Sequence, residues 1–118
     1  MAYRATQKFP RREQFGLAAQ FQRAAVSVAA NIAEGFGRRT TKELLQSLAI
    51  ANGSLEETRY YALLGCELDY IEREDYEALE KQCGSVARLL GALMRSLRTK
   101  INAGKAPVTG HRPPATRN

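Results

Sequence analysis

The sequence has very little of the residues that most often build metal centres and active sites. Its 118 residues include one histidine, two cysteines and no tryptophan. A structural zinc site needs about four Cys or His ligands, and Cys66 and Cys83 are neither close in sequence nor accompanied by a histidine cluster. We therefore expect no metal, no cofactor and no histidine-based catalysis. Both cysteines are interpreted as reduced, packed thiols.

Long apolar runs are also missing. No stretch of 18 apolar residues could span a membrane, and the first ten residues lack the apolar core of a signal peptide. These absences predict a cytoplasmic protein with no membrane partner. The sequence also contains no glycine loop followed by lysine, no helical pair of metal ligands and no nucleophile with a base. We therefore predict that the protein is not an enzyme.

Charge is distributed unevenly along the chain. Residues 1–42 carry eight Lys/Arg and two Asp/Glu, whereas residues 56–80 carry two basic and nine acidic residues. Residues 81–118 then carry eight basic residues and no acidic one. Such segregation suits an anionic partner such as RNA, or neighbouring copies that meet positive to negative. Part of it also fits the helix dipole, which favours acidic residues at a helix start and basic residues at its end.

Apolar residues recur every three or four positions over three long stretches, which predicts amphipathic helices at 13–34, 41–67 and 73–102. The third stretch has the cleanest pattern, a coiled-coil-like seam from Tyr76 to Leu97. Leu89 and Met94 fall off that seam, which indicates contact with a second neighbour. Gly53 inside the second stretch predicts close packing against an alanine-rich first stretch, formed by Ala18, Ala24, Ala25, Ala29 and Ala33. The adjacent Tyr60 and Tyr61 favour packing between subunits over base stacking.

A short turn separates the first two stretches. Gly35 and Gly37 predict a left-handed helix end, and Thr40 with Glu43 predicts a capping box at the next helix start. Asn31 and Glu34 lie on a polar stripe beside the apolar face. We interpret them as structural residues, because no second group is placed to complete an acid–base pair. The helix dipole disfavours Glu34 near a helix end, so we expect the next helix start or Arg38 to offset it.

The two chain ends differ from the middle. Residues 1–9 read as the last turns of a short or truncated helix stopped by Pro10. The helical domain is predicted over residues 1–103 and a flexible basic tail over residues 104–118, which are rich in proline and glycine. The tail, which contains His111, would either add non-specific affinity for RNA or serve solubility alone.

Several blocks of sequence resemble one known family, the four-helix-bundle proteins encoded in intervening sequences of bacterial 23S ribosomal RNA genes. The resemblance runs from about Tyr3 to Ile101 and includes Asn-Ile-Ala-Glu-Gly-x-Gly-Arg at 31–38, Phe15-Gly16-Leu17, Gly53-Ser54-Leu55-Glu56-Glu57 and Asp69-Tyr70-Ile71. It implies an all-α, antiparallel up-and-down four-helix bundle, here with a short or truncated first helix. A more distant similarity to retroelement accessory proteins implies a homo-oligomer, most simply a pentamer.

These observations leave two functions open. The first is an oligomeric protein that binds ribosomal or other RNA, and the second is an oligomeric adaptor between proteins. For the first, we predict an anion site from the free N–H groups of residues 41–43 and the side chains of Arg38, Arg39 and Lys42, because a helix start and paired arginines suit phosphate. Arg11 and Arg12 are further candidate RNA-binding residues. The alternative is that these are ordinary solvated turn residues.

Overall fold

In the computed structural model, the described residues are 5–6, 9 and 16–105. They form three α-helices and no strand: α2 (Leu17–Phe36), α3 (Thr41–Glu67) and α4 (Arg73–Lys105). The all-α prediction is confirmed. The predicted bounds 41–67 are correct for α3, whereas α2 ends two residues later than predicted and α4 three residues later. Residues 13–15, 106–118 and most of residues 1–9 lie outside the described part.

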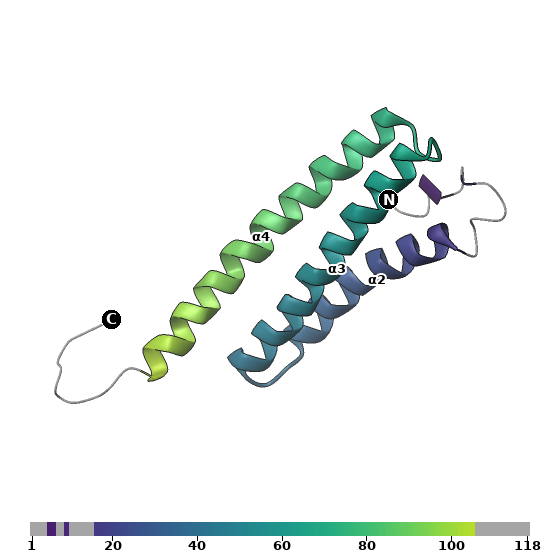
Figure 1. Ribbon diagram of the computed structural model, residues 1–118. Helices are drawn as coiled ribbons and strands as arrows, with labels where there is room; N and C mark the ends of the chain where they lie inside the picture. Colours follow the sequence, from purple (N-terminus) through teal and green to yellow (C-terminus); the bar gives the residue numbers. More distant parts are fainter. Residues whose placement is uncertain (1–4, 7–8, 10–15, 106–118) are drawn as a thin grey trace.

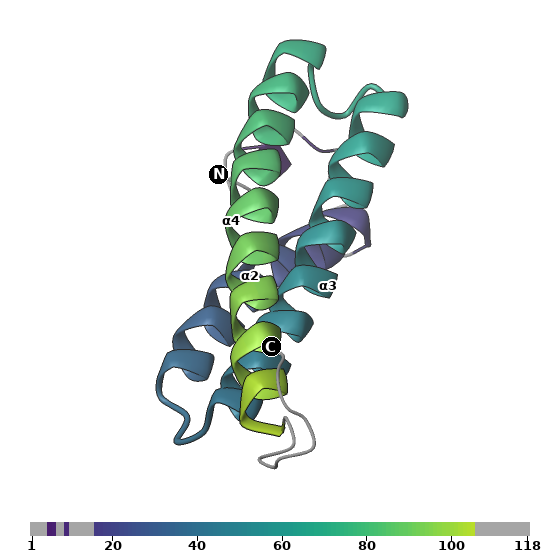
Figure 2. The same ribbon diagram turned by 90° about the vertical axis from the view of Figure 1, so that its left-hand side faces the viewer.

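The expected four-helix bundle is not confirmed, because the described residues supply three helices. Of the predicted first helix, Ala5 and Thr6 are helical and Phe9 lies in a bend. Short connections make consecutive helices antiparallel, and α3 packs against both α2 and α4 (Figures 1 and 2). The α2–α3 turn and the carboxyl end of α4 lie at one end of the molecule, and the α3–α4 turn lies at the other.

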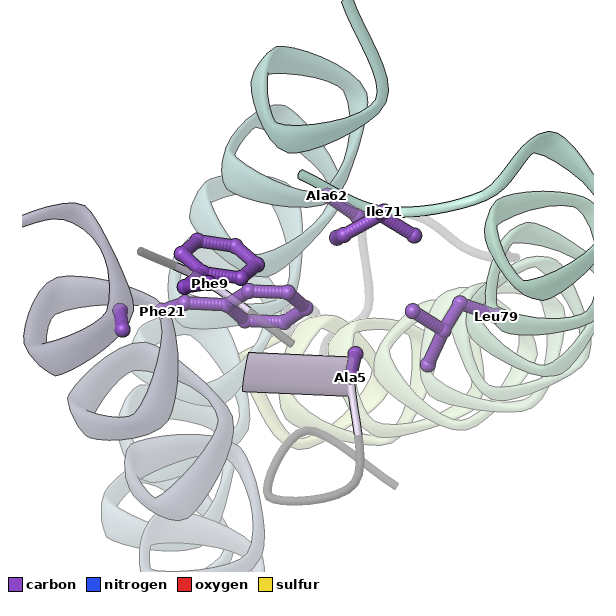
Figure 3. Close-up of a cluster of buried hydrophobic side chains, with 7 residues drawn as sticks. Ala5, Phe9, Phe21, Ala62, Ile71 and Leu79 are labelled. Atoms are coloured by element: carbon purple, nitrogen blue, oxygen red, sulfur yellow. The ribbon is translucent and has the colours of Figure 1, made fainter. Parts of the chain in front are cut away.

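One cluster of buried side chains fills the end near the α3–α4 turn, which we name the closed end. It joins residues from the chain start and from all three helices: Ala5, Phe9, Ala18, Phe21, Ala62, Ile71 and Leu79. Phe9 lies beside Phe21, with ring centroids 6.5 Å apart, and also contacts Tyr70 at 5.3 Å (Figure 3). Gln22 Nε2 donates a hydrogen bond to the fully buried Thr6 Oγ1 at 2.6 Å. The residues described near the chain start therefore cover the core at this end.

A second cluster lies toward the opposite end, which we name the open end. Its buried members come from α3 and α4 alone: Leu48, Ala51, Leu55, Cys83, Leu90, Met94 and Leu97. Val28 and Ile32 of α2 pack against it and are half-buried. The predicted seam of α4 is thus confirmed, but Met94 is buried in the core instead of lying off it, while Leu89 is 71% exposed.

The α2–α3 turn does not use left-handed glycine, contrary to the sequence prediction. Gly35 is still helical, and Gly37 has a right-handed φ of −92°. The Gly37 and Arg38 N–H groups donate to the carbonyls of Glu34 and Gly35, each at 3.1 Å, which tightens the last turn in the manner of a 3₁₀ helix. Gly35 has a different role: a Cβ there would lie 2.9 Å from Ser47 Cβ, so glycine lets α2 and α3 approach closely.

The α3–α4 turn contains the left-handed residue instead. Asp69 has a φ of 62°, and aspartate tolerates this region better than most side chains. The Tyr70 N–H donates to the Gly65 carbonyl at 2.8 Å, and the Asp69 N–H donates to the Cys66 carbonyl at 3.0 Å. These two bonds form a Schellman motif, which satisfies the last carbonyls of α3.

Two packing predictions for small residues are wrong. Gly53 is exposed, and a Cβ there would meet no atom within 4 Å, so close packing does not explain this glycine. Ala18 and Ala24 are buried as expected, but Ala29 and Ala33 are exposed. Because α3 occupies only one side of α2, the alanine-rich face extends beyond the α2–α3 contact. The apolar face of α2 is therefore wider than the core that covers it.

Candidate nucleic-acid interface

The start of α3 is capped by Thr40, as predicted. Thr40 is extended, with φ −121° and ψ 154°, and its Oγ1 accepts a hydrogen bond from the Glu43 N–H at 3.1 Å. The three N–H groups of residues 41–43 were expected to be free, and this bond removes Glu43 from that set. Among the residues that the structure describes, the N–H groups of Thr41 and Lys42 make no hydrogen bond to the protein. Two donors therefore remain at the amino end of α3.

Arg38 pairs with Glu34 across the last turn of α2. The guanidinium and carboxylate lie 3.2 Å apart, and their side chains are 45% and 58% exposed. This confirms that Arg38 offsets the acidic charge near the helix end. The same contact means that Arg38 would have to exchange Glu34 for a phosphate. Exposed ion pairs contribute only about 0–1 kcal/mol, so that exchange costs little.

The predicted site residues are only partly brought together. Arg38, Arg39 and Lys42 are all exposed on one turn. Arg11 and Arg12 lie outside the described residues. The acidic Glu34 and Glu43 share the turn with the three cations, so the turn alone has a weak positive charge.

The structure adds a second basic group to this end. Arg95, Arg98 and Lys100 are exposed in the last turns of α4. Leu44 and Leu45 of α3 pack in the same core cluster as Met94 and Leu97, which places these cations at the same end as the α2–α3 turn. The sequence analysis did not include them in the site. The signal was available, because antiparallel helices at 41–67 and 73–102 set residue 100 beside residue 41.

The closed end carries the opposite charge. Of the nine acidic residues between positions 56 and 80, seven lie from the last residue of α3 through the α3–α4 turn into the first turns of α4, whereas Glu56 and Glu57 lie near the middle of α3. Arg59 pairs with Glu80 through its Nε and Nη2 atoms, at 3.3 and 2.5 Å. The hydrogen bond to Glu80 raises the pKa of Arg59, so this cation stays fully charged. The open end is basic and the closed end is acidic.

The remaining motif residues have structural roles. Asn31 Nδ2 donates to the Ser27 carbonyl at 2.9 Å and to Ser27 Oγ at 3.1 Å. Ser27 Oγ in turn lies 2.8 Å from Ser54 Oγ and so joins α2 to α3. Thr58 Oγ1 donates to the Ser54 carbonyl at 2.8 Å. This chain of hydrogen bonds satisfies polar groups between the two helices and fixes their register.

Cys66 and Cys83 are buried free thiols, as predicted. Burial raises the pKa of the Cys83 thiol, and the charge of nearby Glu80 raises it further.

Within residues 5–6, 9 and 16–105, no cluster of three or more His, Cys, Asp or Glu side chains could hold a metal ion. None of the helices in that part of the chain is long and apolar enough to cross a membrane.

Comparison with known proteins identified a protein family and a similar solved structure. The model of the 23S rRNA-intervening sequence protein family matches residues 1–92. A crystal structure at 1.70 Å, of a protein with unknown function from the S23 ribosomal protein family of Bacteroides thetaiotaomicron VPI-5482, is 27% identical to this chain. The two structures superpose with a TM-score of 0.68, over 71% of this chain and 78% of the other. A search of curated proteins found no match.

Proposed function

This chain belongs to the 23S rRNA-intervening sequence protein family, and from that premise we propose that it is a cytoplasmic, non-enzymatic RNA-binding protein that acts as a homo-oligomer. The observation that carries the proposal is the basic open end. Two groups of cations from distant parts of the chain, residues 38–42 and 95–100, lie together there.

The chemistry of this end suits a phosphate backbone. Six cations share it with two carboxylates, Glu34 and Glu43. Arginine offers forked donors that match phosphate oxygens, and the Thr41 and Lys42 N–H groups lie at the positive end of the α3 dipole. Contacts of this kind recognise charge and backbone shape, so they support binding to structured RNA without base specificity.

Self-association would strengthen such contacts. The similarity to retroelement accessory proteins implies five copies. Several weak sites on one assembly together give a higher apparent affinity for RNA than one site alone. The second candidate function, an adaptor between proteins, is favoured by the exposed apolar residues of the helices, which include Phe36, Tyr60 and Leu89. The two functions differ in their dependence on salt.

The test measures the affinity for a structured 23S ribosomal RNA fragment by fluorescence anisotropy over a series of salt concentrations. The variant replaces Arg38, Arg39 and Lys42 with alanine, and a second variant replaces Arg95, Arg98 and Lys100. Each lost phosphate contact should reduce the slope of log affinity against log salt by roughly 0.7–0.9. Each triple variant should therefore bind more weakly and with a flatter salt dependence.

A matched control removes the same charge elsewhere, by replacing Arg23, Arg73 and Lys81 with alanine. These three residues are exposed and lie away from the open end. The control should retain the wild-type slope. If all three variants lose the same slope, net charge and not the open end governs binding. If the wild-type protein does not bind RNA at moderate salt, the adaptor function is the better explanation.

A further inference from the structure

Phe36, the last residue of α2, presents its ring to solvent. It is 61% exposed, whereas Phe9 and Phe21 are 5% and 0% exposed. Tyr60 is comparably exposed at 58%, but its ring lies against that of Tyr61, with centroids 5.5 Å apart. Among the residues that the structure describes, no other ring lies against Phe36. The packing of the protein therefore does not account for an aromatic side chain at this position.

Phe36 lies on the side of α2 that faces α4. A groove runs between these two helices with α3 as its floor, and Ala25, Ala29 and Ile32 form part of its α2 wall. Phe36 follows Ile32 by four residues and Ala29 by seven, so it continues the same stripe along the helix. The groove therefore ends at Phe36, at the open end of the molecule.

The two groups of cations that make the open end basic both lie near this ring. The first group, within residues 38–42, follows Phe36 directly along the chain. The second group, within residues 95–100, lies at the end of α4, toward which this side of α2 is turned. Glu34 is two residues earlier on α2, so its side chain leaves the opposite side of the helix, where it pairs with Arg38. The environment of the ring is therefore net positive.

The backbone on both sides of Phe36 is held in place. Gly35 packs against α3, where a Cβ would lie 2.9 Å from Ser47 Cβ. The Gly37 N–H donates a hydrogen bond to the Glu34 carbonyl at 3.1 Å. A ring on a fixed backbone loses little conformational freedom when a ligand binds, and this favours affinity.

An exposed aromatic ring beside cations has the chemistry that recognises an unpaired nucleotide. The flat face of a base stacks on an aromatic ring, while cations hold the phosphates along the strand. Bases inside a duplex are already stacked on their neighbours, so loops, bulges and single strands are the parts of an RNA that offer a free face. Phenylalanine has no hydrogen-bonding group in its side chain, so stacking on it accepts any base.

We propose that the ring of Phe36 stacks on an unpaired base of the bound RNA, while cations of the open end hold the phosphates on either side of that nucleotide. This inference rests on the proposed function, because it requires RNA to bind at the open end. It goes further by naming the class of RNA, one that contains a loop, a bulge or a single-stranded segment. The cations give affinity for any RNA, and Phe36 adds a preference for unpaired nucleotides.

The first experiment compares three RNA ligands with equal numbers of phosphates by fluorescence anisotropy. They are a hairpin with an unpaired loop, the same hairpin with abasic loop nucleotides, and a fully paired duplex. Wild-type protein should bind the intact hairpin more tightly than the other two. Phe36→Ala should weaken binding to the intact hairpin by roughly 5- to 150-fold, the contribution of one stacked base, and should bind the intact and abasic hairpins equally. Its salt dependence should remain that of the wild type, because a phenyl ring releases no counterions.

Tyr60→Ala is the matched control. Tyr60 is nearly as exposed as Phe36, but it follows Glu56 and Glu57 in an acidic part of α3. This variant should retain the wild-type preference for the intact hairpin over the abasic one. An equal loss of preference in Tyr60→Ala and Phe36→Ala would overturn the proposal, because the effect would then not belong to the open end.

The second experiment uses the absence of tryptophan from the sequence. Phe36→Trp places a single indole at the proposed stacking position, so its fluorescence reports on this position alone. The intact hairpin at saturating concentration should quench this fluorescence, and the abasic hairpin should quench it much less. Equal quenching by the two hairpins would contradict stacking on a base.

The outcomes separate this inference from the proposed function. If the wild-type protein binds the intact and abasic hairpins with equal affinity and a steep salt dependence, RNA binding stands and stacking by Phe36 is wrong. If it binds none of the three RNAs at moderate salt, the proposed function fails and this inference fails with it.

Discussion

The two ends of this molecule are built from the same three helices but are completed in different ways. At the closed end, Ala5 and Phe9 seal the space between α2 and α4, and the core contains residues from every described segment. At the open end, the buried core contains only α3 and α4 residues, and α2 contributes half-buried side chains. This difference shows that three amphipathic helices can enclose the core at one end and still leave a groove between α2 and α4 along the remaining length. The predictions below test this contrast.

The largest expected effect is at the closed end. Phe21→Ala should lower the free energy of unfolding by about 3–5 kcal/mol, because Phe21 is fully buried and its loss leaves a cavity. Phe36→Ala is the matched control, since Phe36 is 61% exposed at the other end of the same helix. It should change stability by less than about 0.5 kcal/mol. Urea unfolding followed by circular dichroism measures both, and equal losses would contradict the contrast.

Replacing two helical glycines with alanine should change stability by less than Phe21→Ala does, and in opposite directions. Gly35→Ala should destabilise the protein by about 1–3 kcal/mol, because its Cβ would lie 2.9 Å from Ser47 Cβ and 3.1 Å from Leu44 Cδ1. Gly53→Ala should stabilise it by about 0.5–1 kcal/mol, since nothing lies near the new methyl group and alanine favours the helix. Thermal unfolding of both variants gives the comparison. A gain in stability from Gly35→Ala would show that α2 and α3 can separate easily at the open end.

Ion pairs at the two ends should differ as well. Arg59 and Glu80 are 28% and 35% exposed and share two hydrogen bonds, so a double-mutant cycle with alanine should give a coupling energy of about 1 kcal/mol. The same cycle for Arg38 and Glu34, which are more exposed, should give less than about 0.5 kcal/mol. Repeating both cycles at high salt should reduce the coupling energy of Arg38 and Glu34 more than that of Arg59 and Glu80. Equal couplings would mean that exposure does not separate the two pairs.

The smallest effect concerns pH. Burial raises the pKa of the Cys83 thiol above its ordinary value of 9.0, so the unfolded chain loses this proton first. Stability is then fully present below pH 9 and declines as the pH rises through the folded pKa. Cys83→Ala should make urea midpoints fall less steeply between pH 8 and pH 10.5. Burial also raises the pKa of Tyr76, which should leave a remaining decline at the upper limit of that range. Parallel curves for the two proteins would exclude a contribution from the thiol.

Periodicity predicted the helices of this fold because a buried stripe leaves a local signal. The spacing of Leu48, Ala51 and Leu55 identified the face of α3 that is in fact buried, and Thr40 marked the start of that helix. Local patterns could not show which glycine is packed. Gly35 was expected to end a helix and Gly53 to be closely packed, but the position of Ser47 across the α2–α3 contact makes Gly35 the packed one.

The candidate site was predicted in part for the same reason. Arg38, Arg39 and Lys42 are neighbours in sequence and were found together. Arg95, Arg98 and Lys100 join them only through antiparallel packing of α3 and α4. Met94 was misplaced because Leu93 and Met94 both lie within one turn of Leu90 and Leu97, and the spacing alone does not decide which of the two is buried. The exposure of Ala29 and Ala33 could not be predicted either, because an apolar pattern does not show whether another segment covers it.

The separation of charge between the two ends makes the molecule an electric dipole along its helices. A polyanion exerts a torque on such a dipole, so the protein turns its open end toward the anion before the surfaces meet. In physiological salt the field decays over about 8 Å, so the alignment occurs only in the last step of approach. When the protein first approaches a polyanion with another part of its surface, it would then rotate its open end toward the polyanion instead of dissociating.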